Sequence, residues 1–273
     1  MNAAELEKAN AEFWSSLCGS WLARQCGATG RDPDSLRRYD RAYLDFYPYL
    51  LDYVRPGELR DRDVLEVGLG YGTLGQAIAE HGARYLGMDI SPGPVEMMRY
   101  RLEAFGLPGE ASQRDFLDNG LPDQSFDALV SIGALHHTGS LERCLAEAYR
   151  LLRPGGRACL MVYNAFSYRH WATAPLRTLA AAIRERLAVR KPVFNDRLRK
   201  FYDADADDNA APFTEFNSIR RMEALLANFS SVQCRLENCA DFKLLGVKFA
   251  NRTTMLAILG RLLGTDIYIN AVK

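Results

Sequence analysis

The spacing of apolar residues along the chain changes near residue 60. In the first sixty residues, apolar side chains recur every three or four positions, which predicts helices on both sides of a break near Gly27–Pro33. From Val64 onward, short β-branched runs alternate with segments of helical spacing. Strands are predicted at 64–67, 84–88, 126–132 and 158–163, and helices at 73–81, 94–105 and 141–152.

This alternation of strands and helices predicts a parallel sheet covered on both faces. After residue 163 the pattern predicts a helix around 176–187, a helix after Ser218, and two strands at 232–236 and 267–271. The apolar segment 243–264 between those strands is predicted to be helical. The expected division is an N-terminal helical cap (1–60), a core (61–163), a helical cap insertion (164–229) and a final strand pair (230–273).

The stretch VLEVGLGYGTLG, residues 64–75, places glycines directly after a predicted buried strand. Glycines there allow a tight turn and a close approach of the backbone to a ligand. Two motifs fit: G-x-G-x-x-G from Gly70 to Gly75, which is typical of dinucleotide sites, and E-x-G-x-G-x-G from Glu66 to Gly72. The second motif is favoured because it begins where the strand stops, whereas the first gives Gly68 no role.

Bulk composition narrows the choice of partner. The 273 residues allow one domain with an elaboration, and 34 basic residues balance 34 acidic ones. This balance gives no support for a nucleic-acid partner. The acidic N-terminal stretch does not resemble a secretory signal, and no apolar run is long enough to span a bilayer. The six scattered cysteines predict reduced thiols in a cytoplasmic protein and no metal site.

Further landmarks follow the glycines in order. Asp89 ends the second predicted strand, 21 residues after Gly68. Asp115-Phe116 follows a third strand candidate, which lies before the strand at 126–132 and makes that strand the fourth. With FDALVSIGALHHT (126–138) and LLRPGGRACLMVY (151–163), where 154–156 is the expected turn, this series resembles the class I S-adenosylmethionine-dependent methyltransferases, in their small-molecule, type 11 branch. The resemblance implies an α/β fold with a doubly wound, mostly parallel seven-stranded sheet whose last strand is antiparallel. It also implies S-adenosylmethionine as the cofactor.

By the same resemblance, particular residues are expected at the cofactor. The three loop glycines would lie under its methionine part, Glu66 would fix the loop or the amino group, and Asp89 would accept hydrogen bonds from the ribose hydroxyls. Asp115 and Phe116 would hold the adenine. The complete expected set is Glu66, Gly68, Gly70, Gly72, Asp89, Ile90, Asp115, Phe116 and Gly133. For each, a purely structural role in a turn, cap or core is the alternative.

Candidate catalytic and acceptor-binding residues come from the loops and the cap. His136 and His137 follow the fourth predicted strand at the ligand-binding end of the sheet, and one of them is expected to remove a proton from an acceptor. The acidic stretch 203–209 is expected to be a solvated loop. Residues expected to shape the acceptor pocket, with core packing as the alternative, are Trp14, Tyr39, Tyr43, Tyr163 and His170.

The function that follows is methyl transfer to O, N or C of a small organic acceptor, such as a secondary metabolite or a cell-envelope precursor. Two alternatives remain open at this point: an NAD-dependent oxidoreductase, and a non-catalytic binding protein with the same fold. The sequence also leaves a homo-oligomer open.

Overall fold

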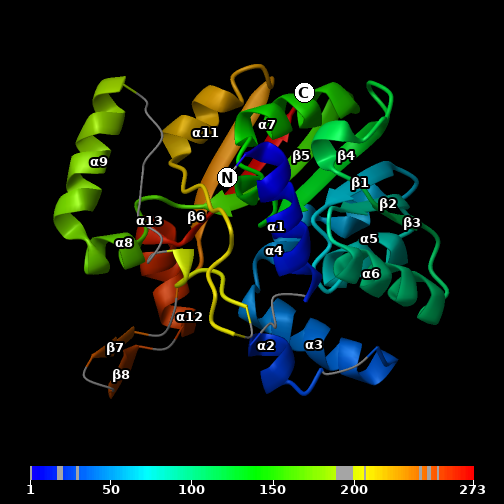
Figure 1. Ribbon diagram of the computed structural model, residues 1–273, viewed down its shortest axis with the longest axis horizontal. Coiled ribbons are helices and arrows are strands. Elements are labelled where there is room, and N and C mark those ends of the chain that lie inside the picture. The colour runs from blue at the N-terminus through cyan, green and yellow to red at the C-terminus, as the bar shows by residue number, and fades with distance from the viewer. Residues whose placement is uncertain are drawn as a thin grey trace.

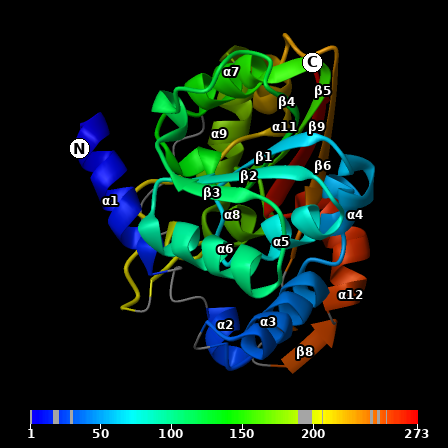
Figure 2. The same cartoon turned by 90° about the vertical axis from the view of Figure 1, so that its right-hand side faces the viewer.

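The computed structural model describes residues 2–16, 21–28, 31–188, 199–205, 207–239, 242–244, 247–250 and 252–273. Its centre is a seven-stranded sheet in the order β3-β2-β1-β4-β5-β9-β6 (Figures 1 and 2). The strands are β1 Asp63–Val67, β2 Arg84–Asp89, β3 Glu110–Gln113, β4 Phe126–Ile132, β5 Leu152–Tyr163, β6 Ser231–Glu237 and β9 Asp266–Val272. Strand β9 is antiparallel to both of its neighbours, β5 and β6, and the other strands are parallel. The predicted fold class is therefore confirmed.

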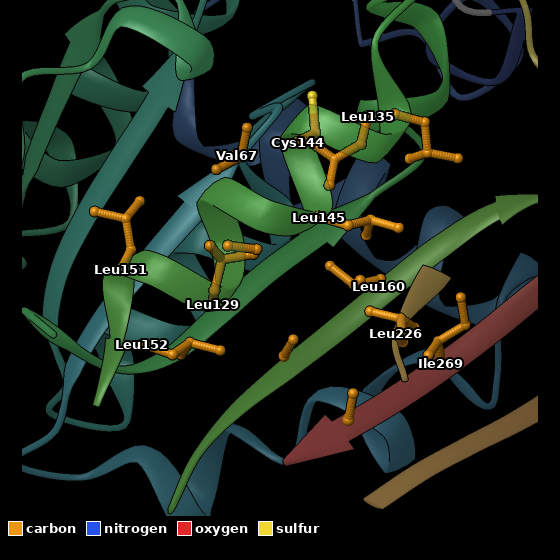
Figure 3. Close-up of a cluster of buried hydrophobic side chains, with 14 of the residues drawn as sticks. Val67, Leu129, Leu135, Cys144, Leu145, Leu151, Leu152, Leu160, Leu226 and Ile269 are labelled. Carbon is orange, nitrogen blue, oxygen red and sulfur yellow. The ribbon is translucent and has the colours of Figure 1, made fainter. Parts of the chain in front are cut away.

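Successive residues of the central strands face opposite layers, as the pleat requires. Leu129 in β4 belongs to a core with helices α7 (Leu141–Leu151) and α11 (Ile219–Leu225). Figure 3 shows this core, with Leu145 and Leu226 pointing at the sheet. Val130, the next residue, packs with α4 (Leu50–Val54), α5 (Thr73–Glu80) and α6 (Pro92–Ala104) on the other face. Both faces are therefore buried, and the strands can be continuously apolar.

Strand β5 begins earlier than the sequence pattern predicts. It follows α7 directly, and the expected turn at 154–156 is an irregularity within the strand. Phe126 pairs with Leu152 and Ala128 pairs with Arg157, so the intervening residues of β5 have no partners in β4. Gly155, with φ of 76°, supplies the left-handed backbone conformation that this irregularity needs.

Further helices flank the core strands in the sequence. The N-terminal ones are α1 Ala3–Ser15, α2 Trp21–Gln25 and α3 Pro33–Phe46, and the 3-10 turn η2 Pro56–Leu59 directly precedes β1. Asp32 caps α3 and Pro33 occupies its first turn, which explains the sharp start of this helix after the predicted break. Helix α1 contacts α6, and Figure 2 shows it at the margin of the molecule. After β5 come α8 (Tyr168–Thr173) and α9 (Pro175–Ala188).

A buried ion pair fixes α3 to the core. Arg101 of α6 is fully buried, and its two terminal nitrogens donate to the two carboxylate oxygens of Asp40 at 2.9 and 2.8 Å. One of these nitrogens also donates to Gln76 Oε1 at 2.5 Å. A bidentate pair of this kind fixes orientation as well as distance. It holds α3, and the tyrosines it carries, in one position over the sheet.

The segment 243–264 differs from its predicted helix. Its first part belongs to a hairpin of β7 (Phe242–Leu244) and β8 (Val247–Ala250), which lies outside the main sheet (Figure 1). The alternation in Val-Lys-Phe-Ala at 247–250 suits a strand, because β-branched and aromatic residues favour it. Helical turns follow in α12 (Arg252–Met255), a π-helical turn at Leu256–Gly260 and α13 (Arg261–Leu263). Residues 245, 246 and 251 lie outside the described residues.

No helix in the described parts of the chain combines the length and the apolar character needed to cross a bilayer.

Candidate active site

A cavity of about 490 Å³ opens at the carboxyl ends of β1, β2 and β4. Ligands of open α/β sheets bind at this edge, where loops from neighbouring strands converge. Residues of helices α1 and α3 also line the cavity. Every residue expected at the cofactor lines it: Glu66, Gly68, Gly70, Gly72, Asp89, Ile90, Asp115, Phe116 and Gly133.

The three loop glycines have positive φ, and their surroundings differ. A Cβ atom on Gly68 would lie 2.3 Å from Ala134 Cβ, and one on Gly72 would lie 2.8 Å from Arg101 Cδ. A Cβ atom on Gly70, where φ is 49°, would meet no protein atom within 4 Å. Two of the glycines are therefore required by packing within the protein. Gly70 instead leaves space in the cavity itself.

Asp89 holds the glycine loop against the end of β2. Its Oδ2 accepts a hydrogen bond from the Leu69 N–H at 2.8 Å, and its Oδ1 accepts one from the Ser91 N–H at 2.9 Å. Burial raises the pKa of this carboxyl above its usual value. A carboxylate has about four acceptor sites, so two bonds leave capacity for a ligand in the cavity. Asp89 therefore has a structural role in addition to the one expected from the sequence.

Asp115 likewise stabilises its own loop and lines the cavity. Its Oδ1 accepts from the Leu117 N–H at 2.9 Å and so caps the 3-10 turn η3 (Phe116–Asp118). The same residue lines the cavity, and the turn places the buried Phe116 ring beside it. The loop after β3 thus brings one acceptor group and one apolar ring to the same wall.

Glu66 is buried at the carboxyl end of β1. The Tyr85 hydroxyl donates to its Oε2 at 2.5 Å. Burial raises the pKa of Glu66 to about 8, so in the free protein the carboxyl is mostly protonated at neutral pH. A Cβ atom on Gly75 would lie 2.6 Å from Glu66 Oε2 and 2.3 Å from the Tyr85 oxygen. The last glycine of the quoted stretch is therefore needed for this hydrogen bond.

The structure separates the two candidate histidines. Both lie in the 3-10 turn η4 (Leu135–His137) after β4, but only His137 lines the cavity. His136 is fully buried beneath it, 4.3 Å from the Tyr163 ring, and among the described residues neither of its ring nitrogens has a hydrogen-bond partner. Burial lowers the pKa of both imidazoles. Of the pair, only His137 can reach a molecule in the cavity.

The hydrogen bonds of His137 fix its tautomer. Its Nδ1 lies 2.7 Å from the carbonyl oxygen of Phe213, which can only accept, so Nδ1 carries the proton. In the neutral ring, Nε2 then has a free lone pair. Asn10 of α1 donates to the backbone carbonyl of His137 at 2.9 Å, and Trp14 packs on the ring at 4.7 Å between centroids. Both the N-terminal cap and the insertion after β5 therefore position this imidazole.

Asp203 is a site residue that the sequence did not reveal. Its Oδ2 lies 3.6 Å from His137 Nε2, and its Oδ1 accepts a hydrogen bond from the Tyr163 hydroxyl at 2.9 Å. In the described part of the chain, neither Nε2 nor Oδ2 has a hydrogen-bond partner. The side chain is only 14% exposed, and burial raises its pKa. The predicted solvated loop is therefore wrong at this position, although Asp207, Asp208 and Asn209 are exposed as expected.

Aromatic side chains also line the cavity and together form an aromatic wall. Of the residues expected to shape an acceptor pocket, Trp14, Tyr39, Tyr43 and Tyr163 line the cavity. Tyr71 stacks on Tyr39 at 4.2 Å between ring centroids. Tyr47, which the sequence also places over the cleft, lines the cavity, as do Tyr71 and Tyr268, which the sequence did not single out.

His170 is placed away from the cavity lining. It is fully buried in α8, with its Nδ1 3.0 Å from Ser167 Oγ and its ring 4.7 Å from that of Phe216. The side chain therefore helps to pack α8 and does not contact an acceptor. The sequence around His170 is rich in aromatic residues, and it does not distinguish a place in the acceptor pocket from a place in the core.

Comparison with known proteins agrees with this geometry. Residues 65–160, which run from β1 to β5, match the family model described as a methyltransferase domain. Over these residues the chain is similar to a methyltransferase domain. The match spans the glycine loop, Asp89 at the end of β2, Asp115 in the loop after β3, and the turn that carries His137.

The relatives that match this region include methyltransferases whose names specify quinones. The chain is 34% identical over 120 residues to demethylmenaquinone methyltransferase of Tropheryma whipplei, covering 44% of this chain and 48% of that protein. It is 31% identical over 125 residues to the ubiquinone biosynthesis O-methyltransferase of Alkalilimnicola ehrlichii, covering 44% and 50%. The chain thus spans about half the length of the curated relatives it matches.

The similarity of fold extends further than that of sequence. A solved S-adenosylmethionine-dependent methyltransferase from Mesorhizobium loti superposes with a TM-score of 0.54 and 14% identity, covering 84% of this chain and 100% of that one. The methyltransferase domain implies S-adenosylmethionine as the cofactor. The cavity fits such a ligand, because Gly70 leaves space in it and the carboxyl groups of Glu66, Asp89 and Asp115 line it.

Proposed function

We propose that this protein transfers a methyl group from S-adenosylmethionine to an oxygen atom of a small hydroxylated ring compound. The observation that supports this most strongly is the meeting, in one cavity, of the glycine loop, the free lone pair of His137 and an aromatic wall. When bound, the cofactor supplies an electrophilic methyl group. The protein must then place the acceptor and remove its proton.

The cofactor would be held by the residues along the strand ends. Glu66, once ionised, can pair with the amino group, and Asp89 can accept hydrogen bonds from the ribose hydroxyls. Asp115 and the Phe116 ring suit the polar edge and the flat face of adenine. Gly133, at the end of β4 with φ of 81°, exposes backbone to the same space. Each of these groups lines the cavity, which supports the assignment.

His137 would act as the general base. Burial keeps its pKa below the usual value, so the ring is neutral at cytoplasmic pH and Nε2 is ready to accept a proton. An acceptor hydroxyl placed near Nε2 would donate its proton there as the oxygen becomes nucleophilic. Asp203, 3.6 Å from Nε2, would stabilise the imidazolium that results. Such assistance is typically worth about 10²–10⁴-fold in rate.

The aromatic wall supports a planar acceptor. Tyrosine and tryptophan faces bind flat rings through stacked or edge contacts. The side chains of Trp14, Tyr39, Tyr43 and Tyr163 offer such faces within the cavity that holds His137. The names of two relatives specify quinones, and one of these relatives is named an O-methyltransferase, which supports a ring acceptor methylated on oxygen. We therefore favour phenols and hydroquinones over aliphatic alcohols and amines.

The test is methyl transfer from radiolabelled S-adenosylmethionine across an acceptor panel. It would contain a catechol, a 1,4-naphthohydroquinone, an aliphatic alcohol and an aliphatic amine. We expect labelled methyl ethers from the ring compounds only. Stabilisation by S-adenosylhomocysteine and not by NADH in a thermal melt is expected as well. Stabilisation by NADH alone, or label found only on nitrogen or carbon, would contradict the proposal.

A further inference from the structure

Helix α9 presents its apolar residues to solvent. Leu176 is 81% exposed and Leu187 is 82% exposed, and Leu179 and Ile183 are exposed as well. At about 100° per residue, these positions form one stripe along the helix. Figure 1 shows α9 at one edge of the molecule, outside the layers that cover the sheet. Helix α9 has 14 residues, and an apolar stripe on a helix of this length normally faces a protein core or a binding partner.

The opposite, polar face of α9 is the one that packs on the protein. The Thr178 hydroxyl is buried and lies within hydrogen-bonding distance of the His170 carbonyl at 3.1 Å. Glu185 is buried and accepts a hydrogen bond from the Ser218 hydroxyl. Arg220 donates to the Arg186 carbonyl at 3.0 Å. These contacts with α8 and the start of α11 set the rotation of the helix, so the apolar stripe points outward.

Arginines flank the stripe on both sides. On a helical wheel, Arg177 and Arg184 lie on one side of it and Arg186 on the other, and all three are exposed. Glu185, the only acidic residue between Pro175 and Ala188, is on the buried face. The outward surface of α9 is thus apolar along its middle and positively charged along its edges. This combination is typical of helices that lie in the plane of a membrane interface.

We propose that α9 docks the protein on an anionic lipid surface, with its apolar stripe in the headgroup boundary and its arginines on the phosphates. Charge complementarity selects this occupant over a second copy of the chain, which would bring identical rows of arginine together. The helix is too short to span a bilayer, so the attachment is peripheral and reversible. The proposal rests on α9 alone and does not depend on the proposed methyl transfer.

The test is co-sedimentation of the intact protein with vesicles of phosphatidylcholine, with and without phosphatidylglycerol. We expect binding to the anionic vesicles that weakens as salt is raised, and little binding to the neutral ones. Leu187→Gln should weaken binding roughly ten-fold, because a leucine is no longer buried in lipid. Arg184→Gln should weaken it about five-fold. Leu51→Gln, which changes a leucine exposed on α4, is the matched control and should bind as the parent does.

Several results would overturn the proposal. Binding that is equal for neutral and anionic vesicles, or that survives both α9 substitutions, would place the lipid contact elsewhere. A dimer in light scattering that Leu187→Gln converts to a monomer, without vesicle binding by the parent, would make the stripe an interface between copies. Circular dichroism of each variant checks that the fold is retained, and methyl transfer to a water-soluble acceptor should be unchanged.

Discussion

Adding one methyl group at Gly70 should weaken cofactor binding with only a modest effect on folding. In Gly70→Ala, the new Cβ meets no protein atom within 4 Å, so no clash with the protein arises. The residue must still adopt φ of 49°, which costs alanine about 1–2 kcal/mol. The new methyl group would occupy space in the cavity that we assign to the ligand. Overfilling a packed site costs about 1–3 kcal/mol, which corresponds to roughly five-fold to over a hundred-fold weaker binding.

Gly106→Ala is the matched control. Gly106 has φ of 62°, an added Cβ there also meets nothing within 4 Å, and the residue does not line the cavity. Chemical denaturation should show similar losses of unfolding free energy for the two variants. Titration calorimetry with S-adenosylhomocysteine should show weaker binding for Gly70→Ala only. Equal affinities for the two variants would refute the idea that the ligand lies against Gly70.

Three further predictions follow from the buried charges. Because burial raises the pKa of Glu66 to about 8, the free protein should lose stability as pH rises from about 5 through 8, and denaturation of Glu66→Gln should show a flatter profile. Asp89→Ala should weaken S-adenosylhomocysteine binding and also lower the unfolding free energy by about 1–3 kcal/mol, since the Leu69 N–H loses its acceptor; calorimetry and denaturation measure the two effects. Asp40→Asn should cost about 3–5 kcal/mol in a denaturation experiment, because it leaves the Arg101 charge buried without a carboxylate.

The sheet could be predicted from the sequence because its strands are buried on both faces. Residues such as Leu129 and Val130 are apolar in succession, and this is visible without knowledge of neighbouring strands. The glycine loop was equally visible, since positive φ at Gly68 and Gly72 restricts which residue fits. The ligand-binding edge of the core follows from these two features.

The contributions of the cap could not be predicted in the same way. Asp203 lies in a polar stretch, and only its contacts with His137 and Tyr163 reveal that it is buried. Only His137 faces the cavity because the two histidines are neighbours in a 3-10 turn and their side chains point in different directions. The periodicity of the sequence does not determine which of the two faces the cavity. Local propensity also misled the interpretation of 243–264, where part of an apolar run forms a hairpin. Long-range packing decides each of these cases.

In the proposed reaction, His137 removes the proton of a ring hydroxyl held beside bound S-adenosylmethionine. Its most direct test is the single-turnover rate of labelled methyl transfer to the best ring acceptor, measured for the parent, His137→Gln and His136→Gln. We expect a loss of about 10²–10⁴-fold for His137→Gln, partly recovered at higher pH, with unchanged S-adenosylhomocysteine affinity. His136→Gln variants that remain folded should transfer methyl far faster than His137→Gln. A parent-like rate for His137→Gln would show that His137 is not the general base.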